Sequence, residues 1–337
     1  MRVAVALIAA ALLTACGEDD TACAQCRLEA RALVQLGPDD HVLDDSRVVQ
    51  DRNGWYYVAP VSETGAVAVY TRHGTFHHLI GRAGQGPGEL GRIDFVLPWG
   101  GDTVAVGSNA RLQLLARSGA YLRTIRPAAR ITAAVPASGD MLLVLQRSAA
   151  HDESPALMAR DGSTARTLQG APDDAQLVAL RAYREEALLI TRRPYGMVLW
   201  PSLEARGDYV RLRASWTDIV TAPDGVERNG GEIIDAWVSG DTAWVLGYRI
   251  HFAHETTAAP RGEARAIRTT VAQRKQLYEP ILQAIDLRTR TVLGAWSWRG
   301  RAAPGAVAGP SAGVATIEET DSGPFLLLWD VRIVQRD

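Results

Sequence analysis

The chain has 337 residues and a mass of 36.4 kDa, and 47% of its residues are hydrophobic while 22% are charged. This composition supports a folded core of one large domain or two small ones, and it excludes a chain that is disordered throughout. Three cysteines are too few for a small domain held together mainly by disulfide bonds. Thirty-six basic against 38 acidic residues give a formal net charge of −2, so the overall charge does not favour a nucleic-acid ligand.

The first residues have the pattern of a secretory signal. Arg2 supplies a positive charge, and Val3–Leu13 is an unbroken run of apolar residues. This run is too short to cross about 30 Å of hydrocarbon, and it has the length of the apolar part of a signal peptide. No later run approaches the length of a membrane-spanning helix, so we expect the rest of the chain to fold in water.

The signal ends in Leu13-Thr14-Ala15-Cys16, which resembles the bacterial lipobox. The resemblance implies that residues 1–15 are removed as a lipoprotein signal peptide and that Cys16 becomes an acylated N-terminus, anchored stably in a membrane. Gly17, where retention at the inner membrane would call for Asp, implies the outer membrane of a Gram-negative-type envelope. The alternative is an ordinary signal peptide with a cysteine close to its end by chance.

Residues 16–27 are predicted to be a tether, and they contain a C-x-x-C motif formed by Cys23 and Cys26. A structural zinc site needs about four ligands, and the sequence has no second C-x-x-C to complete one. A thioredoxin-type pair would lie in a βαβ unit, and no such unit follows. In an oxidising compartment we therefore predict a Cys23–Cys26 disulfide, with a redox-active pair or free or intermolecular thiols as alternatives.

The remainder, residues 28–337, is predicted to be all-β. Helical periodicity is nearly absent there, and short runs of β-branched, leucine and aromatic residues are separated by turn residues. Many of these runs lack alternation between apolar and polar residues, so we expect strands that are covered on both faces. The clearest runs are Trp55–Ala59, Ala66–Tyr70, Phe76–Ile80, Thr103–Val106, Leu112–Leu115, Met141–Leu145, Ala187–Ile190, Trp237–Val238, Thr242–Leu246, Ile281–Asp286, Thr291–Trp296 and Phe325–Trp329.

Similar turns precede the most apolar strands at a regular spacing. The six turns are Asn53-Gly54, Gly101-Asp102, Gly139-Asp140, Glu185-Glu186, Gly240-Asp241 and Ser322-Gly323. Successive turns lie 38 to 55 residues apart, except for a last interval of 82 residues that contains an insertion at about 251–280. A period of roughly 40–50 residues with three or four strands per unit predicts a β-propeller, here with six blades. The long last interval leaves seven blades as an alternative.

A propeller must also close its ring. The final run Val331–Val334 and an early run both need pairing partners. Pairing of N- and C-terminal strands within one blade hides two sheet edges at once. We therefore expect either Leu28–Leu36 or Val42–Val49 to complete the blade that contains Phe325–Trp329.

One segment resembles a known repeat. Gly84–Leu90 reads G-Q-G-P-G-E-L, and Asn109–Leu115 reads N-A-R-L-Q-L-L ahead of a Ser118-Gly119 turn. This order resembles the NHL-type repeat, G-x-G-P-G-x-F followed by N-x-R-[IV]-Q-x-F, with Leu90 and Leu115 in place of the phenylalanines. With the lipobox and the early C-x-x-C, the chain resembles the bacterial six-bladed β-propeller lipoproteins. The resemblance covers roughly residues 50–125, and this family has no defined common activity.

The glycine motif has a structural explanation. Gly84, Gly86 and Gly88 permit positive φ where the chain crosses between blades, and Pro87 fixes its own φ and restricts its neighbour. Glu89 is placed to accept backbone N–H hydrogen bonds inside the turn. A phosphate cradle is the competing interpretation, but the motif has no following helix and no Lys-Ser/Thr pair.

Candidate binding residues are few. Trp296 and Trp298 lie two apart in one predicted strand, share a face and are candidates for an aromatic platform. His251 and His254 form an H-x-x-H pair, although a helical metallopeptidase site needs histidines four apart. Metal ligands cannot be assigned, and we expect no cofactor. Calcium held by Asp-rich turns is the alternative, but these turns are Asp39-Asp40, Asp44-Asp45 and Asp173-Asp174, which lack loop-type ligand spacing.

The insertion at about 251–280 departs most from the repeat. It contains five basic residues and three acids, and long excursions from a rigid scaffold often carry function. The function expected from the sequence is a lipid-anchored binding or scaffold module for a peptide, a glycan or an envelope protein. The alternative is a metal-dependent hydrolase or lyase, similar to propeller lactonases, with its site in the central channel.

Overall fold

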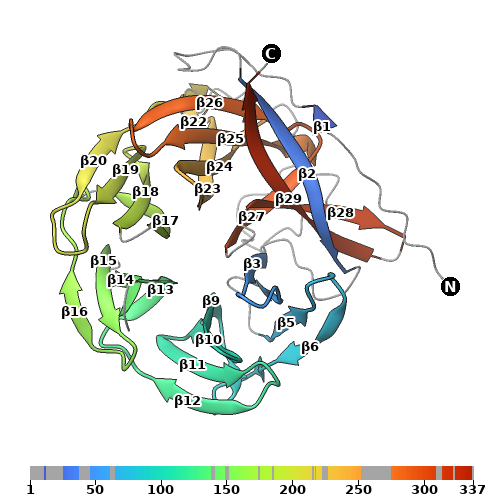
Figure 1. The fold of residues 1–337 in the computed structure, drawn as a ribbon, viewed down its shortest axis with the longest axis vertical. Coiled ribbons are helices and arrows are strands. Elements are labelled where there is room, and N and C mark those ends of the chain that lie inside the picture. Colours follow the sequence, from blue (N-terminus) through green and yellow to red (C-terminus); the bar gives the residue numbers. More distant parts are fainter. Residues whose placement is uncertain are drawn as a thin grey trace.

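A computed structural model shows a ring of small antiparallel sheets around a central axis (Figure 1). The structure describes residues 11–12, 26–37, 46–60, 65–137, 141–148, 152–173, 175–183, 186–214, 216, 218–221, 227–251, 275–308, 313–321 and 323–335. Six four-stranded units form the predicted six blades of an all-β propeller, and blades 6 and 1 belong to one continuous nine-stranded sheet. Among the residues described, no helix has the length and hydropathy needed to cross a bilayer.

The first three blades follow one another along the chain, each with four strands counted from the axis outwards. Blade 1 contains β3 (Ser46–Gln50), β4 (Tyr56–Pro60), β5 (Val67–Tyr70) and β6 (Phe76–Ile80). Blade 2 contains β9 (Ile93–Gly100), β10 (Thr103–Ser108), β11 (Arg111–Ala116) and β12 (Tyr121–Ile125). Blade 3 contains β13 (Arg130–Pro136), β14 (Met141–Arg147), β15 (Glu153–Ala159) and β16 (Thr164–Thr167).

The other three blades complete the ring. Blade 4 contains β17 (Gln176–Tyr183), β18 (Glu186–Arg193), β19 (Gly196–Trp200) and β20 (Asp208–Arg211). Blade 5 contains β23 (Gly231–Ser239), β24 (Thr242–Ile250), β25 (Tyr278–Asp286) and β26 (Thr291–Ser297). Blade 6 contains β27 (Ala302–Ala308), β28 (Gly313–Thr320), β29 (Gly323–Gln335) and β2 (Cys26–Leu36). Short pairs β7–β8 (Arg82–Ala83 and Glu89–Leu90) and β21–β22 (Ile219–Thr221 and Glu227–Asn229) lie between blades, and β1 (Ala11–Leu12) pairs with β2.

The N- and C-terminal strands close blade 6, as predicted. β2 runs antiparallel to β29, from Cys26 opposite Gln335 to Leu36 opposite Leu326 (Figure 1). The segment Leu28–Leu36 is therefore the closing strand, and it begins at Cys26, two residues before the predicted domain boundary. The inner strand of blade 6, β27, also pairs in parallel with β3 of blade 1, which joins the two ends of the ring.

The two faces of the disc are defined by the strand directions. The inner strand of every blade begins on the same face of the disc, and the turns between the second and third strands lie on this face too. We call it the pocket face, because the pocket described below opens there. β2 runs from the opposite face towards the pocket face, because Cys26 pairs with the end of β29. The excursion after Ile250 leaves and returns on the pocket face, and β25 starts at Tyr278, inside the predicted insertion. Residues 252–274 of that insertion lie outside the described residues.

The core is divided among the seams between blades. Six hydrophobic clusters of buried residues occupy the six seams, one between each pair of neighbouring blades. Strands such as β4 and β19 are buried at every position, which confirms the expectation that unalternated runs are covered on both faces. The seam between blades 5 and 6 is rich in tryptophan, with Trp237 and Trp244 stacked at 5.6 Å between ring centroids.

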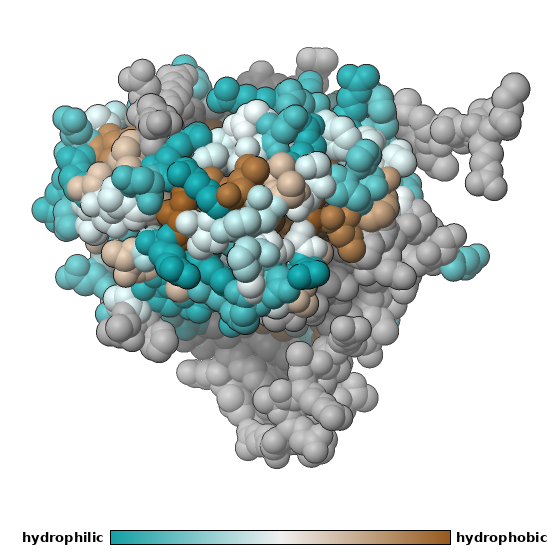
Figure 2. All heavy atoms as spheres, turned by 90° about the horizontal axis from the view of Figure 1, so that it is seen from below, coloured by the Kyte–Doolittle hydropathy of each residue, from teal (hydrophilic) through white to brown (hydrophobic). Residues whose placement is uncertain are grey.

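The rim of the disc is mainly hydrophilic, with small hydrophobic patches (Figure 2). The exposed large hydrophobic residues lie on outer strands: Leu33 on β2, Phe76 and Leu79 on β6, and Tyr121 and Leu122 on β12.

Candidate binding pocket on the propeller axis

A pocket of about 240 Å³ opens near the start of the inner strands. Its lining comes from blades 1 to 5 and consists of Arg47, Arg92, Asp94, Arg130, Thr132, Ala133, Leu145, Arg147, Glu153, Leu177, Val178, Arg192 and Ile234. The inner strands β3, β9, β13, β17 and β23 supply most of these residues, and the ends of β14, β15 and β18 that reach the pocket face supply most of the others. The radial arrangement therefore brings together side chains that are far apart in the sequence.

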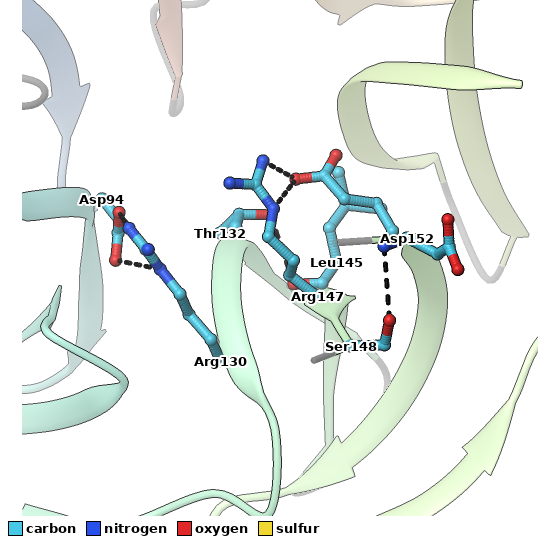
Figure 3. Close-up of polar contacts among 8 residues, drawn as sticks. Asp94, Arg130, Thr132, Leu145, Arg147, Ser148 and Asp152 are labelled. Atoms are coloured by element: carbon cyan, nitrogen blue, oxygen red, sulfur yellow. Dashed lines mark hydrogen bonds and ion pairs between the residues drawn. The ribbon is translucent and has the colours of Figure 1, made fainter. Parts of the chain in front are cut away.

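The pocket is basic. Five arginines and two carboxylates line it, although the whole chain carries a net charge of −2. Both carboxylates are already paired with lining arginines, and Figure 3 shows the pair of Asp94 with Arg130. Nη2 of Arg130 lies 2.5 Å from Oδ1 of Asp94, and Nη2 of Arg147 lies 2.5 Å from Oε1 of Glu153. Among the other lining arginines, Arg192 pairs with Glu232, and Arg47 has no carboxylate partner among the described residues, so Arg47 adds positive charge to the pocket.

Two of those arginines have unused donors. Arg47, half-buried on β3, makes no hydrogen bond or ion pair with any residue that the structure describes. Arg192 pairs with Glu232 of blade 5 through Nη1, but its buried Nε has no hydrogen-bond partner within the described chain. Burial lowers the pKa of Arg192 from its ordinary value, because desolvation disfavours the charged guanidinium.

A smaller part of the lining is apolar. Leu177 and Val178 of β17 and Ile234 of β23 contribute aliphatic side chains from blades 4 and 5. Ala133 and Leu145 extend this surface into blade 3. The pocket thus combines several guanidinium groups with a smaller number of aliphatic groups.

This lining does not fit a divalent cation. Calcium and magnesium need several free oxygen ligands, and both lining carboxylates, Asp94 and Glu153, are bound to arginines. In the described part of the chain, no three His, Cys, Asp or Glu side chains come together in a way that would hold a metal. The two carboxylates that line the pocket are therefore not free to act as metal ligands.

The predicted tryptophan platform is wrong. Trp296 and Trp298 are 2% and 3% exposed and belong to the cluster between blades 5 and 6. The ring of Trp298 packs edge-on against Trp329 at 5.1 Å, and Trp296 packs against Trp244 at 6.2 Å. Both side chains lie in the same cluster, but this cluster is part of the buried core and is not accessible to a ligand.

His251 lies at the pocket face but pairs with a residue that the sequence analysis did not single out. Its Nε2 is 2.9 Å from Oε2 of Glu279 on β25, and Nε of Arg299 is 3.0 Å from Oε1 of the same carboxylate. Burial alone would raise the pKa of Glu279, but hydrogen bonds from Arg299, Ser297 and His251 lower it below its ordinary value. His254 lies outside the described residues.

The glycine motif forms the crossing from blade 1 to blade 2. Oε2 of Glu89 accepts hydrogen bonds from the backbone N–H groups of Gln85 and Gly86, at 3.0 and 2.8 Å. Gly84 and Gly88 have positive φ, at 152° and 75°, whereas Gly86 does not, contrary to the expectation for all three glycines. Pro87 lies between Gly86 and Gly88, in the turn that is held by the Glu89 carboxylate.

Asn109–Leu115, the second half of the repeat-like segment, forms hydrogen bonds with the glycine motif of the first half. The buried amide of Gln113 on β11 accepts a hydrogen bond from the N–H of Gly88 at 2.9 Å and donates one to the carbonyl of Glu89. Arg111 donates from Nη1 to the carbonyl of Gln85 at 2.7 Å. The motif residues therefore hold one another in place, which is a structural role, and they do not line the axial pocket.

The predicted lipidation and disulfide residues cannot be examined in the structure. Cys16 and Cys23 lie outside the described residues, and only the backbone of Cys26 is described, as the first residue of β2. The pocket arginines were missed by the sequence analysis. The signal that marks them is an arginine at or just before the start of successive inner strands, as in Arg47, Arg92 and Arg130.

Comparisons with known proteins show the fold and no family. No family model matches the chain, and no curated protein matches its sequence. A protein of Bacteroides fragilis NCTC 9343 that is described as exported is 11% identical, with a TM-score of 0.59 over 94% of this chain and 98% of that one. The Neurospora crassa Pan2 WD40 domain is 12% identical, with a TM-score of 0.49 over 92% and 97%. At 11% identity, the similarity to the Bacteroides fragilis protein shows the fold alone.

Proposed function

We propose that this chain is a lipid-anchored binding module of a bacterial envelope and that its ligand occupies the axial pocket. The observation that carries the proposal is the pocket itself, a cavity of about 240 Å³ to which blades 1 to 5 all contribute. Ligand sites in proteins are typically concave, largely pre-formed and lined by apolar groups with a few placed polar ones. The axial pocket is concave, but most of its lining residues are charged or polar, so it suits a polar or charged group more than an apolar one.

Anchorage and location rest on the N-terminal sequence. The apolar run Val3–Leu13 followed by Leu13-Thr14-Ala15-Cys16 supports export and acylation of Cys16, after removal of residues 1–15. The exported neighbour from Bacteroides fragilis is consistent with an envelope location. The NHL-like segment between Gly84 and Leu115 supports membership of the propeller lipoproteins. A peptide, a glycan or an envelope protein that presents a small group to the pocket would be its partner.

The topology gives the anchored protein an orientation. The tether enters the propeller at Cys26, which lies on the face opposite the pocket. The ten residues from Cys16 to Cys26 span at most about 35 Å when extended. An acylated Cys16 would therefore hold the opposite face towards the membrane and leave the axial pocket directed away from it.

The anchor is tested by replacing Cys16 with Ser. We expect the wild-type chain to incorporate labelled palmitate and to sediment with the envelope, and Cys16→Ser to do neither. Cys26→Ser serves as the matched cysteine control and is expected to be acylated normally. Acylation of the Cys16→Ser variant, or none in the wild type, would refute the lipid anchor.

The pocket as the ligand site is tested by a thermal-shift screen of small charged and neutral compounds. Compounds that stabilise the wild type are expected to lose their effect on Ala133→Phe, because a phenyl ring at Ala133 fills the cavity. The melting curve of this variant without ligand reports that it is folded. Stabilisation that is equal in both proteins would place the ligand elsewhere and contradict the proposal.

The same protein sample separates a binding module from a metal-dependent hydrolase or lyase. Elemental analysis is expected to find no stoichiometric calcium or zinc, and a chelator is expected to leave the melting temperature unchanged, because Asp94 and Glu153 are engaged by arginines. A bound metal whose removal lowers the melting temperature would favour the enzyme instead.

A further inference from the structure

The charge distribution in the axial pocket indicates the class of its ligand. The two lining carboxylates are each bound by one arginine, Asp94 by Arg130 and Glu153 by Arg147. A third lining arginine, Arg192, is paired with Glu232. Positive charge remains, because lining arginines outnumber the carboxylates bound to them. A ligand with a negative charge is the group that would balance it.

Arg47 and Arg192 both line this cavity. Arg47 has no partner among the described residues, and the buried Nε of Arg192 lacks a hydrogen bond. A buried N–H donor without a partner costs free energy, which an oxygen atom of a ligand can recover. A guanidinium presents a planar fork of N–H groups that matches the oxygens of a carboxylate or a phosphate.

The size and the apolar side of the pocket restrict the ligand further. A volume of about 240 Å³ lies below the range of drug-sized sites, so the group that enters is small. Leu177, Val178 and Ile234 cover the side formed by blades 4 and 5, where a hydrocarbon part can be buried. An inorganic anion would leave that surface uncovered.

We propose that the axial pocket binds a small organic anion, with a carboxylate or phosphate held by Arg47 and an apolar body packed against Leu177, Val178 and Ile234. This inference rests on the proposed function, since it names the ligand class of the same pocket. The site forms no covalent bond to its ligand. The charged group is desolvated on binding, and the guanidinium groups replace its water.

Isothermal titration of the folded protein with benzoate and phenyl phosphate tests the inference, with benzamide as the neutral analogue of benzoate. We expect at least one of the anions to bind and benzamide to bind at least about tenfold more weakly, because it lacks the charge. The comparison of benzoate with phenyl phosphate shows whether the pocket prefers a carboxylate or a phosphate group. Inorganic phosphate is expected to bind more weakly than phenyl phosphate, because it has no apolar part.

Arg47→Gln is the decisive variant, since it removes the charge of a side chain that makes no hydrogen bond or ion pair with the described part of the chain. It is expected to weaken binding of the anion at least about tenfold. Arg52→Gln is the matched control, because Arg52 is exposed on the opposite face of the same blade, and it is expected to leave the affinity unchanged. Arg47→Lys keeps the charge without the planar fork and is expected to give an intermediate loss.

The outcomes separate this inference from the proposed function. Failure of both anions to bind the wild type would overturn the anion class. Equal affinity in Arg47→Gln would overturn the proposal that Arg47 holds the charged group. Benzamide binding as tightly as benzoate, and blocked by Ala133→Phe, would also overturn the anion class while keeping the pocket as a ligand site. Anion binding that is unchanged in Ala133→Phe would overturn both the anion site and the axial pocket as its location.

Discussion

Arg181 of blade 4 and Asp235 of blade 5 form an ion pair across the seam between their inner strands. Nη2 of Arg181 lies 2.5 Å from Oδ1 of Asp235, and the side chains are 15% and 7% exposed. The same Oδ1 accepts the N–H of Ala236 at 2.8 Å. Arg130–Asp94 and Arg192–Glu232 likewise join neighbouring blades, so charged contacts as well as hydrophobic clusters hold the ring together.

Asp235→Ala should therefore be strongly destabilising. Removing one partner of a buried pair leaves an uncompensated charge and costs about 3–5 kcal/mol. Glu29→Ala is the control, because it breaks the exposed Arg27–Glu29 pair, which is worth about 0–1 kcal/mol. Urea unfolding of both variants measures the difference. Equal unfolding midpoints would mean that the Arg181–Asp235 contact contributes nothing to the seam.

Glu89 predicts a dependence of stability on pH. Hydrogen bonds from the N–H of Gly86, from Arg82 and from the N–H of Gln85 lower the pKa of Glu89 below its ordinary value of 4.5. Its ionised form therefore stabilises the fold at pH values above 4.5, and this stabilisation is lost as the pH falls through the lowered folded value. Glu89→Gln should be less stable than the wild type at pH 7.

The measurement is urea unfolding of wild type and Glu89→Gln between pH 7 and pH 3. The difference between their unfolding free energies should shrink below pH 4.5, the ordinary pKa of the residue. A difference that stays constant to pH 3 would show that the carboxylate is not stabilised by its charge, and that the side-chain amide serves the turn equally well.

Trp296 should act on stability and not on ligand binding. Its ring is buried in the tryptophan-rich seam beside Trp244, so Trp296→Ala should cost about 3–5 kcal/mol through lost contacts and a cavity. Tyr121→Ala, on the exposed rim, should change stability by about 0.5 kcal/mol or less. Unchanged stability in Trp296→Ala would restore a surface role for this residue.

The number of blades, their closure and the non-alternating strands could be predicted from the sequence, because turn residues and apolar runs are local signals. The axial pocket could not. Arg47 and Arg192 are brought to one cavity only by the radial arrangement of blades 1 and 4, and nothing near either residue in the sequence indicates the other. Trp296 and Trp298 show a second limit of prediction from the sequence. Their spacing places both side chains on one face of a strand, but it does not indicate whether that face is buried.

The closing strand predicts a contrast between two leucines of β2. Leu28 is 1% exposed and packs in the cluster that contains Trp329 and Val331, whereas Leu33 is 42% exposed. Leu28→Ala should lose about 2–5 kcal/mol, and Leu33→Ala about 0.5 kcal/mol or less. Denaturant unfolding compares the two. Equal and small losses would indicate that β2 can be displaced from β29 without cost and that blade 6 is held by its other strands.

The final prediction concerns orientation at a membrane. If acylated Cys16 anchors the chain, the face where β2 begins lies towards the bilayer, and the turns of the pocket face lie away from it. A fluorophore at Asn53→Cys, in the β3–β4 turn, should be quenched more strongly by spin-labelled lipids than one at Asp152→Cys, in the β14–β15 turn. Both positions are exposed, and Cys23 and Cys26 are replaced by Ser in each protein so that each has one reactive thiol. Stronger quenching at Asp152 would mean that the axial pocket faces the membrane and receives its ligand from lipid.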